Sequence, residues 1–246
     1  MKKALLLLIL IPLIGTSQLR SRIKKETQKI VATKVAVPLN IDIAAGLKEA
    51  LNNGITKQVS LLTATNGFYN NDIVKILMPP EMQKVENMMR NIGLSALADD
   101  GIKSLNRAAE DAVKTATPIF ITAIKNMNFA DAKSILLGSE NAATTFLQKG
   151  TNENLYQKFS PIVQQSIGKV GADVAWSKII SKYNAIPLMA KVNPDLTDYV
   201  TQKALEGVFK MIAVEEKNIR TKLDSRTTTL LKQVFGMQDT GNNIVK

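Results

Sequence analysis

DDGIKSLNRAAEDAVKTATPIFITA, residues 99–123, is the stretch that decides the fold. Its apolar residues recur at spacings of three and four, which is the pattern of one face of an α-helix. Most of them are alanines, so a neighbouring helix can approach closely. Pro118 is expected to kink or break this helix near Thr117, because proline removes a backbone donor and restricts the residue before it. The apolar face consists of Ile102, Leu105, Ala109, Ala112, Ala116, Ile119 and Ala123.

Similar patterns on both sides of this stretch predict an all-α fold with roughly nine or ten helices. Glycines at the ends of the apolar segments, such as Gly54, Gly138 and Gly236, are expected to stop helices. One short apolar stretch, 73–78, could instead be extended. Helices are expected over 41–53, 56–64, 81–91, 99–123 with its break, 128–138, 141–149, 154–168, 172–183 with Trp176, 195–222, and 224–235 with Asp224 as its cap.

The organisation predicted for the chain is one bundle-like helical domain over residues 41–236. No linker rich in proline, glycine or serine divides this region, and no repeat of fixed period occurs in it. Residues 18–40 are expected to form a basic linker arm, and residues 237–246 a flexible tail. A shared core of this size can hold together without disulfides.

The first seventeen residues, MKKALLLLILIPLIGTS, have the layout of a secretory signal peptide. Two lysines precede an apolar run from Ala4 to Ile14, and small residues follow. The run is too short for a membrane span, which needs ~20 apolar residues. Cleavage is expected after Ser17, and the absence of cysteine excludes a lipoprotein. The mature protein is therefore expected in the periplasm or associated with the envelope.

The basic residues are concentrated in the arm. The chain has 32 Lys and Arg against 21 Asp and Glu, a formal charge of +11. Residues 18–40 contain six basic residues and one acidic residue, a net +5. Such an arm could contact anionic membrane or cell-wall polymer, or it could be a solvated linker. Nucleic-acid binding is not indicated, because no aromatic residues are interleaved with these charges.

The chain contains no histidine and no cysteine. This excludes a Ser-His-Asp triad, a cysteine nucleophile and a zinc site built from His or Cys. No calcium loop of EF-hand type occurs either. The sequence therefore predicts neither a metal nor a cofactor, and it leaves carboxylates, lysine, serine and tyrosine for any catalysis.

Some polar residues lie where the helical pattern predicts burial. Glu215 falls near the middle of the apolar face of the helix that begins at Asp195, and Glu216 falls at its flank. A buried carboxylate must be paired or protonated, so replacing Glu215 with glutamine is expected to destabilise the fold. The candidate partners are Arg107, Arg220 and Arg226.

A second polar group follows Leu105 in the stretch that opens this section. Asn106 lies at the edge of the alanine face, and Glu110 lies slightly further from the middle of that face. Arg107 can reach Glu110 or Asp111 along the helix. Three interpretations remain open: local helix pairing, a buried network that fixes helix register, and a site that uses Glu110 or Glu215 as acid or base. The candidate polar cluster is Asn106, Arg107, Glu110, Glu215, Arg220 and Arg226.

Several of these segments resemble the bacterial domain-of-unknown-function family 4197. The resemblance implies a helical exported protein, and it implies no reaction, because the family has no assigned activity. The segments that carry it include Gly46–Leu51, Gly67–Asn71, Leu105–Glu110, Pro118–Phe120, Ala142–Thr144, Phe159–Val163, Tyr199–Thr201, Glu216 with Ile219–Arg220, Arg226–Thr228 and Val234–Gly236.

The function expected from these observations is that of a non-catalytic binding or interaction module, with an envelope protein, lipid or cell-wall polymer as its partner. Two alternatives remain. One is an enzyme that uses two carboxylates, Glu110 and Glu215, to cleave a cell-wall glycan. The other is a carrier of lipid or another apolar ligand in a cavity between alanine-lined helices.

Overall fold

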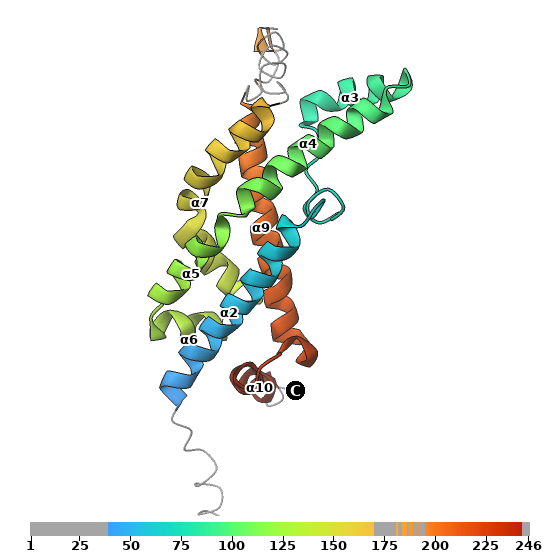
Figure 1. The fold of residues 1–246 in the computed structure, drawn as a ribbon. Coiled ribbons are helices and arrows are strands. Elements are labelled where there is room, and N and C mark those ends of the chain that lie inside the picture. Colours follow the sequence, from blue (N-terminus) through green and yellow to red (C-terminus); the bar gives the residue numbers. More distant parts are fainter. Residues whose placement is uncertain are drawn as a thin grey trace, which may run out of the picture. The chain divides into compact units, whose positions relative to one another are not determined.

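The computed structural model describes residues 39–169, 181, 184–185, 187–188, 191 and 195–242. These residues form eight α-helices and two short 3₁₀ helices, and no strand is found among them. The all-α class is therefore confirmed (Figure 1). The elements are α2 (Leu39–Thr63), η1 (Pro80–Met82), α3 (Gln83–Asn91), α4 (Ser95–Val113), α5 (Ala116–Asn126), α6 (Phe129–Leu137), α7 (Ala142–Gly168), α9 (Leu196–Thr221), η2 (Leu223–Ser225) and α10 (Thr229–Asn242).

The described helices are fewer than the nine or ten expected, because two pairs of expected helices are continuous. α2 runs through Gly54, and α7 runs through Gly150. A Cβ atom at position 54 would lie 3.2 Å from the Cγ of Glu215. Gly54 therefore permits close approach to α9 and does not end a helix. The helix expected over 172–183, with Trp176, lies outside the described residues apart from residue 181.

The long apolar stretch breaks close to the expected place. α4 ends at Val113 and α5 begins at Ala116, with Pro118 in its first turn. The missing N–H of Pro118 costs little there, because first-turn amides have no partner within their own helix. Asn128 and Asp131 form the capping box at the start of α6, and Gly138 follows its end, as the sequence predicts.

The last helix differs from its expectation at both ends. Asp224 lies in η2 and caps no α-helix, so this prediction is wrong. The hydroxyl of Thr228 instead accepts a hydrogen bond from the N–H of Leu231 at 3.2 Å, at the start of α10. α10 then continues through Gly236, its expected stop, to Asn242.

The alanine face of α4 lies in the middle of the core. α7 packs against both α4 and α9, and α4 also contacts α9 (Figure 1). Ala108, Ala109 and Ala112 are fully buried, so α4 approaches its neighbours closely. The rings of Phe120 and Phe209 meet edge to face, with centroids 5.9 Å apart.

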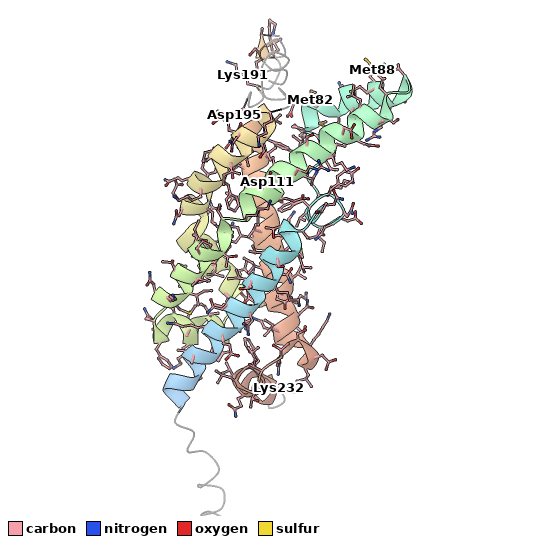
Figure 2. All side chains as sticks on the ribbon, in the orientation of Figure 1. Met82, Met88, Asp111, Lys191, Asp195 and Lys232 are labelled. Carbon is pink, nitrogen blue, oxygen red and sulfur yellow. The ribbon has the colours of Figure 1, made fainter. Side chains whose placement is uncertain are left out.

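The hairpin formed by α3 and α4 carries exposed apolar side chains. Met88, labelled on α3 in Figure 2, is 64% exposed, and Ile92 and Leu97 are exposed by 66% and 59%. Arg90 joins the two helices through its ion pair with Asp99 of α4, and it also pairs with Glu86 within α3. Among the helices that the structure describes, none has the length and apolarity required to cross a membrane.

Candidate functional site

Asn106 and Glu110 of α4 fasten the segment between α2 and η1. Asn106 is fully buried, and its side-chain amide donates to the carbonyl oxygens of Ile76 at 2.8 Å and Ile102 at 2.7 Å. Its Oδ1 accepts from the N–H of Ile76 at 2.8 Å. One turn further along α4, Glu110 is 6% exposed and accepts from the N–H of Phe68 at 3.2 Å. This pair, the loop clamp, therefore holds the segment at two points.

The segment held by the loop clamp begins with a tight turn. Asn66 has a φ of 63°, and a Cβ atom at Gly67 would lie 2.3 Å from the carbonyl oxygen of Leu61. Only glycine fits at position 67 for this reason. Phe68 follows with its ring fully buried in the core. The turn thus delivers the N–H of Phe68 to Glu110.

Ile76 has the backbone geometry of a β-strand residue. Its N–H and C=O both bond to the same Asn106 side chain, so they point to the same side, as they do in an extended chain. Burial alternates in the same way: Val74 and Ile76 are buried, while Ile73 and Leu77 are half exposed. The extended stretch expected over 73–78 is therefore present only around Ile76. Ile73 and Val74 belong to a turn, in which the N–H groups of Val74 and Lys75 donate to the carbonyl oxygen of Asn71, and no sheet is found in the described part of the chain.

Glu215 is buried at 7% exposure, as its place on the apolar face predicts. Its partners are not the arginines expected from the sequence. Lys57 donates to both of its carboxylate oxygens at 2.8 and 2.9 Å, and Gln58 donates at 2.8 Å. Both partners lie on α2, so Glu215 joins α2 to α9.

Glu216, which the sequence places only at the flank of α9, makes a larger set of bonds. It accepts from the N–H groups of Ala143 at 2.9 Å and Thr144 at 2.8 Å, and from the Thr144 hydroxyl at 2.8 Å. These are first-turn amides of α7, whose own N-cap residue, Asn141, makes no side-chain cap. Glu216 therefore caps α7 from a different helix.

Arg220 continues this arrangement to the end of α6. It pairs with Glu216 at 2.8 Å and donates to the carbonyl oxygens of Ile135 at 2.8 Å and Leu136 at 3.1 Å. Both members of the ion pair are almost fully buried, with side-chain exposures of 7% and 6%. Glu216 and Arg220, the cap pair, thus fasten both sides of the α6–α7 turn to α9.

Arg226 performs the same task for α9 itself. It is 2% exposed and donates to the carbonyl oxygens of Ile219 at 3.0 Å and Arg220 at 2.9 Å. Cationic donors stabilise helix C-termini, where carbonyl groups lack partners. The ring of Phe235 lies 5.9 Å from the guanidinium carbons of both arginines.

The candidate cluster therefore does not form one site. Asn106 and Glu110 belong to the loop clamp. Glu215 and Arg220 line one small cavity beside Phe235, and Arg226 bonds to the carbonyl oxygen of Arg220. Arg107 is exposed on α4, and no ion pair joins it to Glu110 or Asp111 in the described part of the chain. The described residues also contain no group of acidic side chains suited to a metal ion.

A groove that sequence reasoning missed lies between the 73–80 segment and α9. Its volume is about 420 Å³. Half-exposed Ile73 and Leu77 contribute apolar surface, and three lysines stand at its rim. The sequence feature that could have indicated this groove is the row of charged residues at 203, 206 and 210 on one face of α9. The lining residues are Ile73, Val74, Lys75, Ile76, Leu77, Met78, Pro80, Gln83, Tyr199, Lys203, Glu206, Gly207 and Lys210.

The polar groups of this groove are partly engaged with one another. Glu206 pairs with Lys203 at 2.8 Å and Lys210 at 2.6 Å, and hydrogen bonds from the two lysines hold the pKa of its carboxyl below the usual value. Burial raises the pKa of Tyr199, whose hydroxyl donates to the carbonyl oxygen of Leu77 at 3.2 Å. With Lys75 included, the side chains that line the groove carry three positive charges against one negative charge.

Tyr156 and Asp198 join α7 to α9 near the start of α9. Tyr156 donates to Asp198 at 2.7 Å, and this bond raises the pKa of Tyr156 to about 12. Because this pKa lies above the unfolded value of about 10, the bond contributes stability at pH below about 10 and loses it as the pH rises through the folded value.

Replacing Asp198 with asparagine is therefore expected to bring the ionisation of Tyr156 back toward that of an ordinary tyrosine. Ultraviolet absorbance titration of the folded protein measures this shift, and Tyr156→Phe identifies which of the four tyrosines is responsible. A titration curve that is the same with and without Asp198 would contradict the assignment.

Together, fold and geometry define an all-α protein in which buried Asn106, Glu216 and Arg226 bond to loops and helix ends of the same chain. The chain belongs to the family described as "Protein of unknown function (DUF4197)", whose model matches residues 38–236. Comparison with curated proteins and with solved structures finds no match.

Proposed function

We propose that this protein is an exported, non-catalytic binding module of the cell envelope, and that the groove between the 73–80 segment and α9 is its ligand site. One observation carries the proposal: the groove combines apolar surface with a surplus of positive charge, while the buried carboxylates are bonded elsewhere. Concave sites with apolar linings and a few converging polar groups are the usual places for ligands.

The carboxylate-enzyme alternative lacks a supporting observation. A glycoside hydrolase needs two carboxyl groups that face one substrate, about 5–10 Å apart. Neither Glu110 nor Glu215 lines the groove, and both are bonded to N–H donors of their own chain. Glu215 borders a separate small cavity, which Glu110 does not reach.

The alternative of a lipid or apolar-ligand carrier also lacks a supporting observation. The cavity beside Glu215 measures about 20 Å³. That space holds about one water molecule, whereas an acyl chain needs far more. The alanine face of α4 is covered by α7 and α9, which pack directly against it.

Export is part of the proposal and rests on the layout of residues 1–17. We expect the protein recovered from the envelope or periplasmic fraction to begin at Gln18, which N-terminal sequencing measures. The basic arm that follows would then lie outside the cytoplasm, where it can contact anionic lipid or wall polymer. A product in the cytoplasm that keeps Met1 would contradict export.

The ligand site is tested by placing a photo-crosslinking residue at Leu77 in the exported protein. Leu77 lines the groove and is 53% exposed, whereas Leu137, at the end of α6, is 70% exposed and outside it. We expect a discrete adduct from position 77 and none from position 137. Equal adducts at both positions, or none at either, would contradict a binding role for the groove.

Position 88 supplies a second comparison. Met88 is 64% exposed on the α3–α4 hairpin (Figure 2). An adduct at 88 without one at 77 would move the interaction surface to the hairpin and overturn the proposed site. The mass of any adduct distinguishes protein, lipid and glycan.

A further inference from the structure

We infer that the groove binds an extended acidic segment of a partner polypeptide, which pairs as a parallel strand with the backbone of residues 75–77. This inference rests on the proposed ligand site and names the chemistry of its occupant. Strand addition to an open backbone edge is a recurring mode of peptide recognition. The argument depends on the backbone of three residues and on the charges beside it.

The backbone at Ile76 is already hydrogen-bonded along one edge, in the way that a β-strand is bonded to its neighbour. The Asn106 side chain of α4 accepts a hydrogen bond from the N–H of Ile76 and donates one to its C=O, both at 2.8 Å, as a neighbouring strand would. In an extended chain the groups of residues 75 and 77 point to the opposite edge. The Tyr199 hydroxyl of α9 reaches the Leu77 carbonyl at 3.2 Å, so this second edge faces the groove.

Two backbone groups on the groove edge have no partner in the described part of the chain: the C=O of Lys75 and the N–H of Leu77. The other two are engaged, because the N–H of Lys75 donates to Asn71 at 2.8 Å and the C=O of Leu77 accepts from Tyr199. In a parallel pair, one incoming residue donates to residue i−1 and accepts from residue i+1. The two free groups match this pattern around Ile76 and specify parallel pairing.

The charge around this edge selects an acidic partner. Lys75 lies on the strand, with its ammonium group 4.2 Å from the ring centroid of Tyr69. Lys203 and Lys210 lie on α9 across the groove and share Glu206. Among the side chains that line the groove, one negative charge leaves a surplus of two positive charges; Glu81, whose charge helps to raise the pKa of Tyr199, offsets part of it. Half-exposed Ile73 and Leu77 offer apolar contacts beside them. A segment that alternates acidic and apolar residues fits both features.

The test uses two labelled heptapeptides with blocked ends, one alternating Glu and Val and the other alternating Lys and Val. Fluorescence anisotropy with the folded chain measures binding. We expect saturable binding of the Glu peptide and none of the Lys peptide. Lys203→Glu combined with Lys210→Glu should abolish binding of the Glu peptide, whereas Lys232→Glu on α10 should leave it unchanged.

Backbone pairing is tested by methylating single amide nitrogens of the Glu peptide. Methylation of the amide that donates to the Lys75 carbonyl should weaken binding on the order of tenfold, which is the value of about one hydrogen bond. Methylation of the next amide, which points to the opposite edge of the peptide, should not weaken binding. Leu77→Pro removes the free N–H and should weaken binding similarly, compared with Leu77→Ala, which keeps it. Circular dichroism confirms that both variants fold.

Three results would overturn the inference: equal binding of both peptides, no dependence on the methylated position, or no saturation up to millimolar peptide. The proposed ligand site would survive these results if position 77 crosslinks to lipid or glycan. An absence of any adduct at position 77 would instead remove the ligand site itself.

Discussion

Replacing Glu216 with alanine is expected to lower the free energy of unfolding by about 3–5 kcal/mol, the usual cost of removing one partner of a buried ion pair. The change leaves Arg220 at 7% side-chain exposure without its carboxylate. It also leaves the N–H groups of Ala143 and Thr144 without their acceptor. Urea denaturation followed by circular dichroism measures the loss.

Glu215→Gln is the matched control for this prediction, because Glu215 is adjacent in the chain and equally buried. Its charged partner Lys57 is 60% exposed, so water can solvate the ammonium group once the carboxylate is gone. Glutamine can also still accept from Gln58. We expect a measurable loss of about 1 kcal/mol or less. Equal losses for the two variants would contradict the distinct role of Glu216.

Replacing Asn106 with aspartate is expected to cost at least about 3 kcal/mol at neutral pH, although the two side chains have nearly the same shape. The amide nitrogen of Asn106 donates to the carbonyl oxygens of Ile76 and Ile102. A carboxylate oxygen in that place would face two carbonyl oxygens in a fully buried site. The variant must therefore hold a buried charge or take up a proton.

The pH dependence identifies this cause. The introduced carboxyl group can donate to one carbonyl once it is protonated, so its folded pKa would be raised above the unfolded value. The stability penalty should then be small at acidic pH and grow as the pH rises from the unfolded pKa toward the folded one. Asn106→Leu loses the same bonds without a charge and should show no such growth. Asn70→Asp, at an exposed position, should cost little at any pH; a flat penalty for Asn106→Asp would contradict the argument.

The sequence predicts the helical class well, because its signals are local. The alanine face around Ala109, the capping box at Asn128 and the cap at Asp195 depend only on residues within a few positions. The failures involve distant residues. Gly54 reads as a helix stop in isolation, and its purpose becomes clear only when Glu215 lies against it.

The candidate site shows the same division. The burial of Glu215 follows from its position on a helical face, but its partner Lys57 lies 158 residues away on α2. The role of Glu216 does not follow from the sequence, because a position at the flank of α9 gives no sign that the start of α7 packs there. The groove was missed for a related reason, since the sequence does not show that Lys203 and Lys210 face Leu77.

Segments that resemble the family meet in pairs in the structure. The Gly67–Asn71 segment meets Leu105–Glu110 through the bond between Phe68 and Glu110. The Ala142–Thr144 segment likewise meets the segment with Glu216 and Arg220. These residues therefore have a structural purpose within the chain.

The cap pair has a consequence for hydrogen exchange. First-turn amides of a helix normally lack an intrahelical acceptor and exchange readily with solvent. The N–H groups of Ala143 and Thr144 are instead buried against a carboxylate of α9. We expect their protons to exchange slowly, because exchange requires the Glu216 carboxylate of α9 to leave the start of α7. The exchange rates of these two amides therefore measure the opening of the core, although the amides lie at the end of a helix, where exchange normally measures only fraying.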